Sequence, residues 1–153
     1  ENGRKVKGLR EINGKIYYFS DGPESRYGHY YDQVRGLLVN PYNENYYNST
    51  SKAAPTYFFD AETGAALTNQ FFNWGGDWYY FGPDGKALIF DQVINGQHLY
   101  FRNNGKQVKG QFISDYKGTR YYDENSGELV TNQTRTINGV TYLFDENGRP
   151  TQL

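Results

Sequence analysis

The chain alternates between short aromatic segments and polar turns that end in glycine. The aromatic segments are residues 17–19, 57–59, 79–81, 100–101, 121–122 and 142–144. Inward and outward positions alternate with a period of two in these segments, which is typical of strands. No segment shows a 3.6-residue period, so we expect strands and little or no helix.

The glycines of these turns recur at a nearly constant spacing. They are Gly22, Gly64, Gly85, Gly105, Gly127 and Gly148, so successive intervals are 42, 21, 20, 22 and 21 residues. Within the units, the preferred dipeptides of type I′ hairpin turns are Asn13-Gly14, Asn95-Gly96 and Asn138-Gly139, with Gly75-Gly76 and Lys117-Gly118 in equivalent places. Each unit of about 21 residues is predicted to be a β-hairpin, too small to bury a face alone. The sequence therefore predicts an all-β fold, a β-solenoid of stacked hairpin repeats.

Alternation assigns two faces to the aromatic segments. The last position of each segment is aromatic and is expected to point inward: Phe19, Phe59, Phe81, Phe101, Tyr122 and Phe144. Two residues earlier, on the same face, stand Tyr17, Tyr57, Tyr79, Leu99, Arg120 and Tyr142. The intervening residues are expected to point the other way: Tyr18, Phe58, Tyr80, Tyr100, Tyr121 and Leu143.

We expect a single repeat domain over residues 1–153, with units that end near residues 22, 36, 64, 85, 105, 127 and 148. Residues 27–36 look like a shortened unit, and residues 37–56 are expected to be an irregular insertion, rich in Asn, Ser and Pro from residue 40 on. The insertion either flanks a site or is merely tolerated. The sequence has no initiator Met and no signal peptide, so we expect a fragment of a larger secreted protein.

The composition argues against several classes of function. The net charge of −1, with 16 scattered Lys and Arg, argues against nucleic acid. The absence of Cys excludes disulfides and thiolate chemistry, and no apolar run approaches the roughly 18 residues that span a bilayer. His29 and His98 are far apart, and the sequence contains neither a phosphate loop nor a nucleophile elbow. We therefore expect no catalytic residues, no metal and no cofactor.

What remains is aromatic, amide and ammonium chemistry, which suits carbohydrates. A pyranose packs its C–H face on an aromatic ring and offers hydroxyls to donors and acceptors at the rim. Gln107 and Lys109 lie on one side of a predicted strand with Val108 on the other, and Tyr80 and Tyr100 lie on the outward face of preceding segments. Two interpretations stay open: a sugar pocket, or a solvated strand face with tyrosines that pack between units.

Four segments closely resemble the glucan-binding repeats of bacterial glucansucrases, within the wider cell-wall-binding and choline-binding repeat superfamily. They are NGKIYYFSDG, GGDWYYFGPDGKAL, INGQHLYFRNNGKQVKG and INGVTYLFDENGRP. The resemblance covers nearly the whole chain, with residues 23–63 least typical. It implies a non-catalytic module of a sucrose-dependent glucosyltransferase that binds dextran-like α-glucan chains.

In that family a stacking Tyr is paired with a Gln-x-Lys motif. The resemblance assigns the motif to Gln107 and Lys109, the stacking role to Tyr79 or Tyr80, and a neighbouring position to Tyr100. The alternation favours Tyr80 over Tyr79. Gln33 and Arg35, with Tyr18, form a second, weaker candidate pocket, because Arg replaces Lys and the unit is shortened.

The resemblance implies a secreted or cell-surface protein of a Gram-positive bacterium. Its expected partner is an α-glucan polysaccharide or isomalto-oligosaccharide, with no nucleic acid, no membrane insertion and a monomeric state. The alternatives are a cell-wall or surface-glycan anchoring module, a purely structural spacer and, more remotely, an enzyme. Choline-binding modules build cages from Trp, and this chain has only Trp74 and Trp78, both in one unit, which argues against choline.

Overall fold

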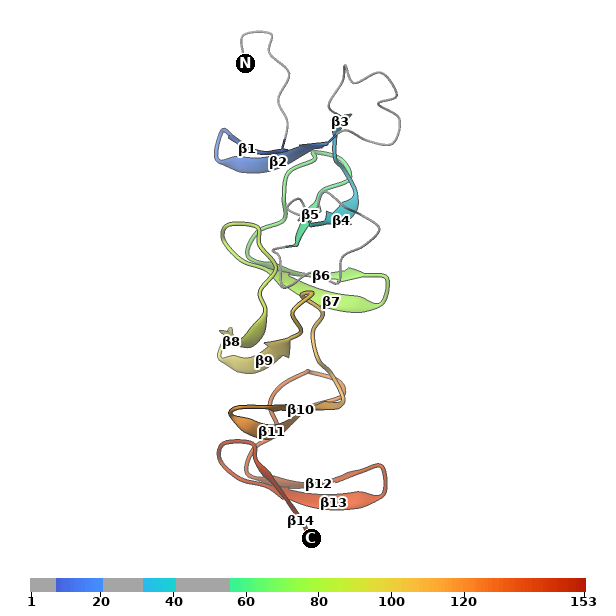
Figure 1. Ribbon diagram of the computed structural model, residues 1–153, viewed down its shortest axis with the longest axis vertical. Coiled ribbons are helices and arrows are strands. Elements are labelled where there is room, and N and C mark those ends of the chain that lie inside the picture. Colours follow the sequence, from blue (N-terminus) through green and yellow to red (C-terminus); the bar gives the residue numbers. More distant parts are fainter. Residues whose placement is uncertain (1–7, 21–31, 41–55) are drawn as a thin grey trace. The chain divides into compact units, whose positions relative to one another are not determined.

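The computed structural model describes residues 8–20, 32–40 and 56–153 (Figure 1). Within these residues every regular element is a β-strand, as the sequence predicts. The chain divides into two compact units, which we describe separately: unit 1 within Glu1–Leu88 and Asn103–Gly105, and unit 2 from Ile89–Arg102 and Lys106–Leu153. Among the described residues, no helix has the length and apolarity needed to cross a membrane.

Unit 1 contains three antiparallel sheets. The first is formed by β1 (Gly8–Ile12), β2 (Lys15–Ser20) and β3 (Asp32–Gln33). The others are the pairs β4 (Leu37–Val39) with β5 (Tyr57–Phe59), and β6 (Gln70–Trp74) with β7 (Asp77–Phe81). Leu37–Val39, which the sequence analysis placed inside the irregular insertion, are thus a paired strand. Residues 27–31 of the proposed shortened unit lie outside the described residues.

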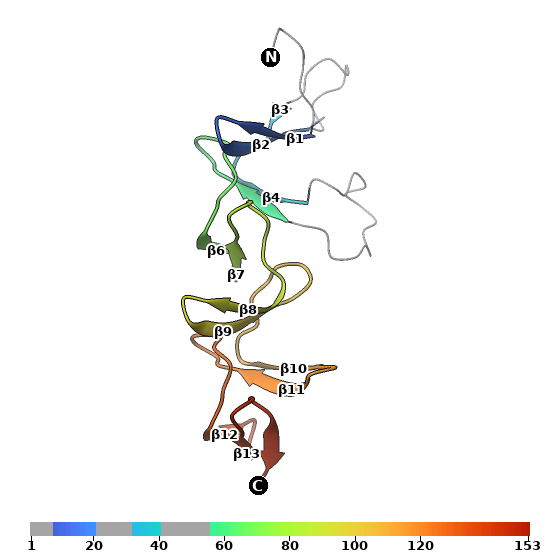
Figure 2. The same ribbon diagram turned by 90° about the vertical axis from the view of Figure 1, so that its left-hand side faces the viewer.

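Unit 2 repeats the same arrangement, with hairpins that follow one another along the unit (Figures 1 and 2). The strand pairs are β8 (Phe90–Ile94) with β9 (Gln97–Phe101), and β10 (Gln111–Asp115) with β11 (Gly118–Tyr122). The last sheet contains β12 (Gln133–Ile137), β13 (Val140–Phe144) and β14 (Pro150–Gln152).

The hairpin turns have the conformations that their residues favour, with one change. In Asn13-Gly14, Asn95-Gly96 and Asn138-Gly139 both residues have positive φ, as a type I′ turn requires. The remaining turn of unit 2 is shifted by one residue, because Asp115 pairs with Gly118. Its loop residues are therefore Tyr116 and Lys117, and Gly118, with φ of 101°, begins β11.

The hydrophobic core consists of separate clusters between successive hairpins. In each cluster the outward ring of one aromatic strand packs against inward rings of the next hairpin: Phe58 joins Tyr79 and Phe81, Tyr100 joins Tyr122, and Tyr121 joins Phe144. Five of the six predicted inward residues, Phe59, Phe81, Phe101, Tyr122 and Phe144, are at most 1% exposed, and Phe19 is half-buried. Of the outward residues, Phe58, Tyr100 and Tyr121 are buried because the next hairpin covers them, whereas Leu143 is 47% exposed.

A short extended segment follows each glycine turn and returns along the aromatic strand. Bridges pair Phe59 with Ala66, Phe81 with Ala87, Phe101 with Gln107 and Tyr122 with Leu129. We call this bridging residue the return position. Within each unit, the glycine of the next turn packs directly on it, as Gly85 does on Ala66 and Gly148 on Leu129. A methyl group added to Gly85 would lie 3.2 Å from Ala66, so glycine is required there both by its φ of 81° and by the lack of space.

Candidate functional site

Gln107 occupies a return position, and Lys109 follows two residues later. The backbone N–H of Val108 between them donates to the carbonyl of Tyr100 at 2.8 Å, and the Val108 side chain is 1% exposed in the core cluster of Tyr100 and Tyr122. Because successive side chains of an extended segment point to opposite sides, Gln107 and Lys109 are directed away from that core. Both are half-buried.

The two side chains meet the turn Asp123–Gly127. Lys109 Nζ donates to the carbonyl of Asn125 at 3.1 Å, and Gln107 Nε2 donates to the carbonyl of Ser126 at 3.5 Å. A methyl group on Gly127 would overlap Gln107 Nε2, and Gly127 has φ of 73°. The amide, the ammonium and two backbone carbonyls are therefore gathered at one place in unit 2.

Asp123 organises this turn. Its carboxylate accepts the backbone N–H groups of Asn125 and Ser126, both at 2.8 Å, and the Ser126 hydroxyl at 3.2 Å. The Arg135 guanidinium donates to its other oxygen at 2.8 Å. These bonds, led by that from the Ser126 N–H, lower the pKa of Asp123, so it stays ionised and the turn stays closed over a wide pH range.

Unit 1 contains the same arrangement at Gln33 and Arg35. Arg35 donates to the carbonyl of Glu62 at 2.6 Å, and a methyl group on Gly64 would lie 2.7 Å from the Gln33 amide. Asp60 accepts the backbone N–H groups of Glu62 and Thr63 at 2.9 and 2.8 Å, and the bond from Thr63 is the main cause of its lowered pKa. The turn Asp60–Gly64 thus closes with the same hydrogen bonds from its own backbone to the aspartate as Asp123–Gly127.

The two sites differ in how the basic residue is used. Arg35 donates to the side-chain oxygen of Gln33 through Nε and Nη2, at 2.8 and 2.7 Å. Its guanidinium therefore occupies the acceptor that the motif would offer to a ligand. Lys109 donates to the carbonyl of Asn125 at 3.1 Å, and its ammonium on a flexible stem lacks the planar fork with which Arg35 holds Gln33.

A difference in turn length accompanies the motif. The turns that face Gln33 and Gln107 have five residues after the last aromatic residue, with the glycine counted. The turns that end at Gly85, Gly105 and Gly148 have four. The longer turns close with a bond between residues four apart, Gly64 to Asp60 and Gly127 to Asp123, whereas Gly85 and Gly148 bond to the residue three before them. Their sequences share an Asp at the start and Thr or Ser before the glycine.

The pairing of motif and longer turn does not follow from the repeat pattern. Asp60-Ala61-Glu62-Thr63-Gly64 and Asp123-Glu124-Asn125-Ser126-Gly127 end in a repeat glycine like the other turns. The extra residue in each turn was the available indication. Arg135, which holds Asp123, comes from β12 and had no comparable sequence signature.

The tyrosines assigned to the pocket have different surroundings. Tyr79 is 3% exposed in the core of unit 1, and burial raises its pKa; Tyr100 is 9% exposed and packs 5.7 Å from Tyr122. Tyr80 is half-buried and makes an edge contact with Phe71, at 4.8 Å between ring centroids. Tyr18 stacks on Phe59 at 5.9 Å. Gln107, Lys109 and Tyr100 belong to unit 2, and Tyr79 and Tyr80 to unit 1.

Two family models match parts of the chain. The choline-binding repeat matches residues 92–133, and the cell wall binding repeat matches residues 69–87. Glucosyltransferase-I of Streptococcus downei is 45% identical over 97% of this chain, and Glucosyltransferase-S of Streptococcus mutans is 35% identical over 96%. The chain is a repeat domain of the glucansucrase type. It spans 8% and 9% of those two relatives, so the repeat domain corresponds to a small, non-catalytic part of them.

Solved structures confirm the fold of the repeat domain. Choline binding protein F of Streptococcus pneumoniae matches 95% of this chain and 45% of its own, with a TM-score of 0.67 and 22% identity. The modular autolysin of the same organism matches 98% of this chain and 35% of its own, with a TM-score of 0.60 and 16% identity. These likenesses establish the β-solenoid of hairpins. The streptococcal relatives also indicate a surface or secreted protein.

Proposed function

We propose that this repeat domain binds α-glucan chains, dextran above all, and holds a glucosyl unit at Gln107 and Lys109. The observation that carries the proposal is the pairing of the Gln-x-basic motif with a turn lengthened by one residue, which occurs in both units. A structural spacer has no need of this pairing, because the units that lack it form the same hairpins and bridges.

The chemistry of the site fits a neutral sugar. Gln107 offers a donor and an acceptor, and Lys109 offers three donors. The side chains of Gln107 and Lys109 already donate to backbone carbonyls of the turn. A sugar hydroxyl that takes the place of either carbonyl therefore meets a donor that is already held in position. The stacking role that the resemblance assigns to Tyr79 or Tyr80 stays a prediction from the sequence. The names of the relatives as glucosyltransferases support a glucan as the ligand.

Gln33 and Arg35, with Tyr18 nearby in sequence, form the proposed weaker pocket of unit 1. A ligand there must displace the guanidinium from the Gln33 oxygen before it can use that acceptor. One stacked ring and a few hydroxyl contacts give a dissociation constant on the order of mM, about −4 kcal/mol. A long glucan that reaches both pockets gains through effective concentration.

We further propose that the protein acts as a monomer outside the cell, on the surface of a Gram-positive bacterium, in a parent glucosyltransferase that uses sucrose. The domain then keeps the polymer close to the parent protein. Electrophoresis of the purified domain in gels that contain dextran, mutan or starch tests the binding. We expect retardation by dextran; migration equal to a non-binding standard in all three gels contradicts the proposal, and release by choline but not by isomaltotriose would indicate a choline module.

A further inference from the structure

Unit 2 contains a cavity of about 620 Å³ that neither Gln107 nor Lys109 lines. Its walls come from the β8–β9 hairpin, the β10–β11 hairpin and the turn before β14. The volume lies in the range of about 300–1,000 Å³ that is usual for small-molecule sites.

The cavity exists because two tyrosines of the repeat pattern are missing. In unit 1, the rings of Tyr57 and Tyr79 pack against Gly85 and Gly105, each about 3 Å from a methyl group placed there. The corresponding positions of β9 and β11 hold Leu99 and Arg120, and both line the cavity. The replacement of two phenol rings leaves space that the other hairpins fill.

Arg120 is a buried cation that uses all five of its N–H donors inside the protein. Nη1 donates to Asp115 Oδ1 at 2.8 Å and to the Gly118 carbonyl at 3.1 Å, and Nε donates to the Tyr122 hydroxyl at 3.2 Å. Nη2 donates to Asp115 Oδ2 at 3.1 Å and to Asp91 Oδ1 at 3.3 Å. Arg120 therefore has no donor left for a ligand and acts by positioning Asp91.

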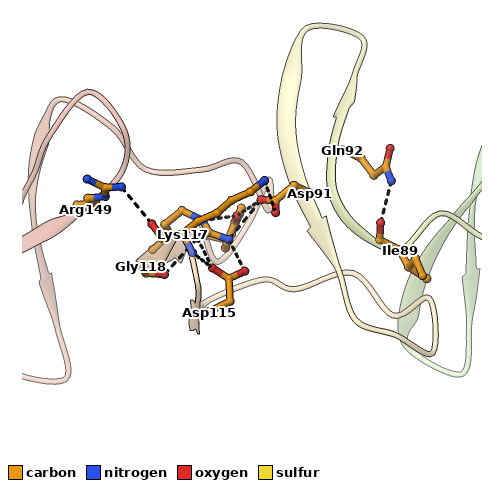
Figure 3. Close-up of polar contacts among 9 residues, drawn as sticks. Ile89, Asp91, Gln92, Asp115, Lys117, Gly118 and Arg149 are labelled. Carbon is orange, nitrogen blue, oxygen red and sulfur yellow. Dashed lines mark hydrogen bonds and ion pairs between the residues drawn. The ribbon is translucent and has the colours of Figure 1, made fainter. Parts of the chain in front are cut away.

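The ligand-facing groups are Asp91, Lys117 and Arg149, and Figure 3 shows Lys117 between the other two. Lys117 Nζ donates to Asp91 Oδ2 at 3.1 Å, and their side chains are 46% and 36% exposed. Arg149 uses one donor, Nη2, on the Lys117 carbonyl at 3.4 Å. Its Nε and Nη1 donors have no hydrogen-bond partner among the described residues.

We propose that this cavity is a second saccharide site of unit 2, in which Asp91 accepts and Lys117 and Arg149 donate hydrogen bonds to the hydroxyls of one glucosyl unit. The inference rests on the proposed function and adds a site without a Gln-x-Lys motif. Asn147 and Gln92 add amide groups to the lining, and the exposed rings of His98 and Tyr116 stand at its edge.

The charges favour a neutral polyol over an ion. Asp91 and Asp115 offset two of the three basic residues Lys117, Arg120 and Arg149, which leaves a net charge of +1. A quaternary ammonium would face three cations without an aromatic cage. An anion would face the Asp91 carboxylate, which Arg120 and Lys117 hold at the cavity.

The test is an NMR titration of the ¹⁵N-labelled full chain with isomaltotriose, read separately at the two sites. We expect shifts at Asp91, Lys117 and Arg149 as well as at Gln107 and Asn125. Arg149→Ala should weaken binding at the cavity at least fivefold and leave the Gln107 shifts unchanged. Lys86→Ala is the matched control, because Lys86 is also exposed and also follows a turn glycine. Asp91→Asn, which keeps the size of the side chain, should act like Arg149→Ala.

Each outcome has a distinct meaning. Shifts at Gln107 and Asn125 alone overturn the cavity site and leave the proposed function standing. Shifts at the cavity alone support this inference and contradict the Gln107–Lys109 pocket. Shifts at neither site contradict both. Glycerol phosphate or choline that shifts Lys117 and Arg149 where isomaltotriose does not would identify an ion site and overturn the proposal.

Discussion

The side-chain amide of Gln107 lies directly against the α-carbon of Gly127, in the space that a Cβ atom would need. Gln33 makes the same contact with Gly64, whereas at Ala66, Ala87 and Leu129 the glycine of the next turn meets an apolar side chain. The proposed binding residue therefore also stands at the point where one repeat packs on the next. Stability and binding are coupled at this position.

That coupling predicts the effect of Gly127→Ala. The substitution combines a strained backbone, costing about 1–2 kcal/mol, with an overlap that displaces Gln107. Gly139→Ala is the matched control, since Gly139 has φ of 81° but nothing within 4 Å of an added methyl group. Chemical denaturation should show a larger loss of unfolding free energy for Gly127→Ala, and only this variant should lose dextran retardation. Equal losses of unfolding free energy in both variants would show that the contact between Gln107 and Gly127 does not contribute to stability.

Deletion of Ser126 tests the role of the longer turn. The shortened turn reads Asp-Glu-Asn-Gly, which is the sequence of residues 145–148, so it should close as that turn does. The carbonyls that Gln107 and Lys109 contact would be displaced. We expect circular dichroism and the melting temperature to change little while isomaltotriose binding falls at least tenfold. Unchanged isomaltotriose binding would show that the longer turn does not contribute to the site.

Asp115→Ala should destabilise the domain. The substitution removes the two Asp115 oxygens that accept from Arg120, and the Arg120 side chain is only 5% exposed. Loss of bonds to a buried charge costs about 2–3 kcal/mol, moderated here because Asp115 is partly exposed and Asp91 remains. Arg120→Tyr introduces the residue that β5, β7 and β13 hold at this position and should retain most of the stability. Urea denaturation of both variants measures the difference.

Acid should weaken the fold through the same aspartates. The Arg120 side chain, which donates to Asp115, lowers the pKa of this carboxyl to about 2, and the bonds to Asp123 lower its pKa as well. Because both folded-state values lie below those of the unfolded chain, their stabilisation is complete above about pH 5 and is lost as the pH falls toward 2. Melting temperatures measured from pH 7 to pH 2 should fall in that window. Asp115→Asn should flatten part of the decline.

Most of the fold could be predicted from the repeat pattern. The aromatic segments, their inward face and three type I′ turns follow from alternation and from Asn-Gly dipeptides, and the structure has them. The sequence could not reveal that Phe58, Tyr100 and Tyr121 are buried, because the next hairpin covers them and that contact is not local. It also placed the start of the insertion too early, since Leu37–Val39 pair with β5.

The candidate site was only partly predictable. The side of the strand on which Gln107 and Lys109 lie follows from the burial of Val108. The contacts to Asn125 and Ser126 depend on how the next turn closes, and the extra residue of that turn is their only indication in the sequence. The Arg120 network joins two hairpins through Asp91 and Asp115, which no spacing in the sequence connects.

The measurement that tests the central claim most directly is the affinity of the parent domain, Lys109→Ala and Lys86→Ala for dextran, obtained from retardation across a series of dextran concentrations. Lys109→Ala removes a charged donor whose hydrogen bonds are worth roughly 1.5–3 kcal/mol, so we expect at least a tenfold loss at the site. Its melting temperature should stay within about 2 °C of the parent, as for most substitutions outside the core. Lys86→Ala should bind like the parent. Equal retardation of all three folded proteins would contradict glucan binding at Gln107 and Lys109.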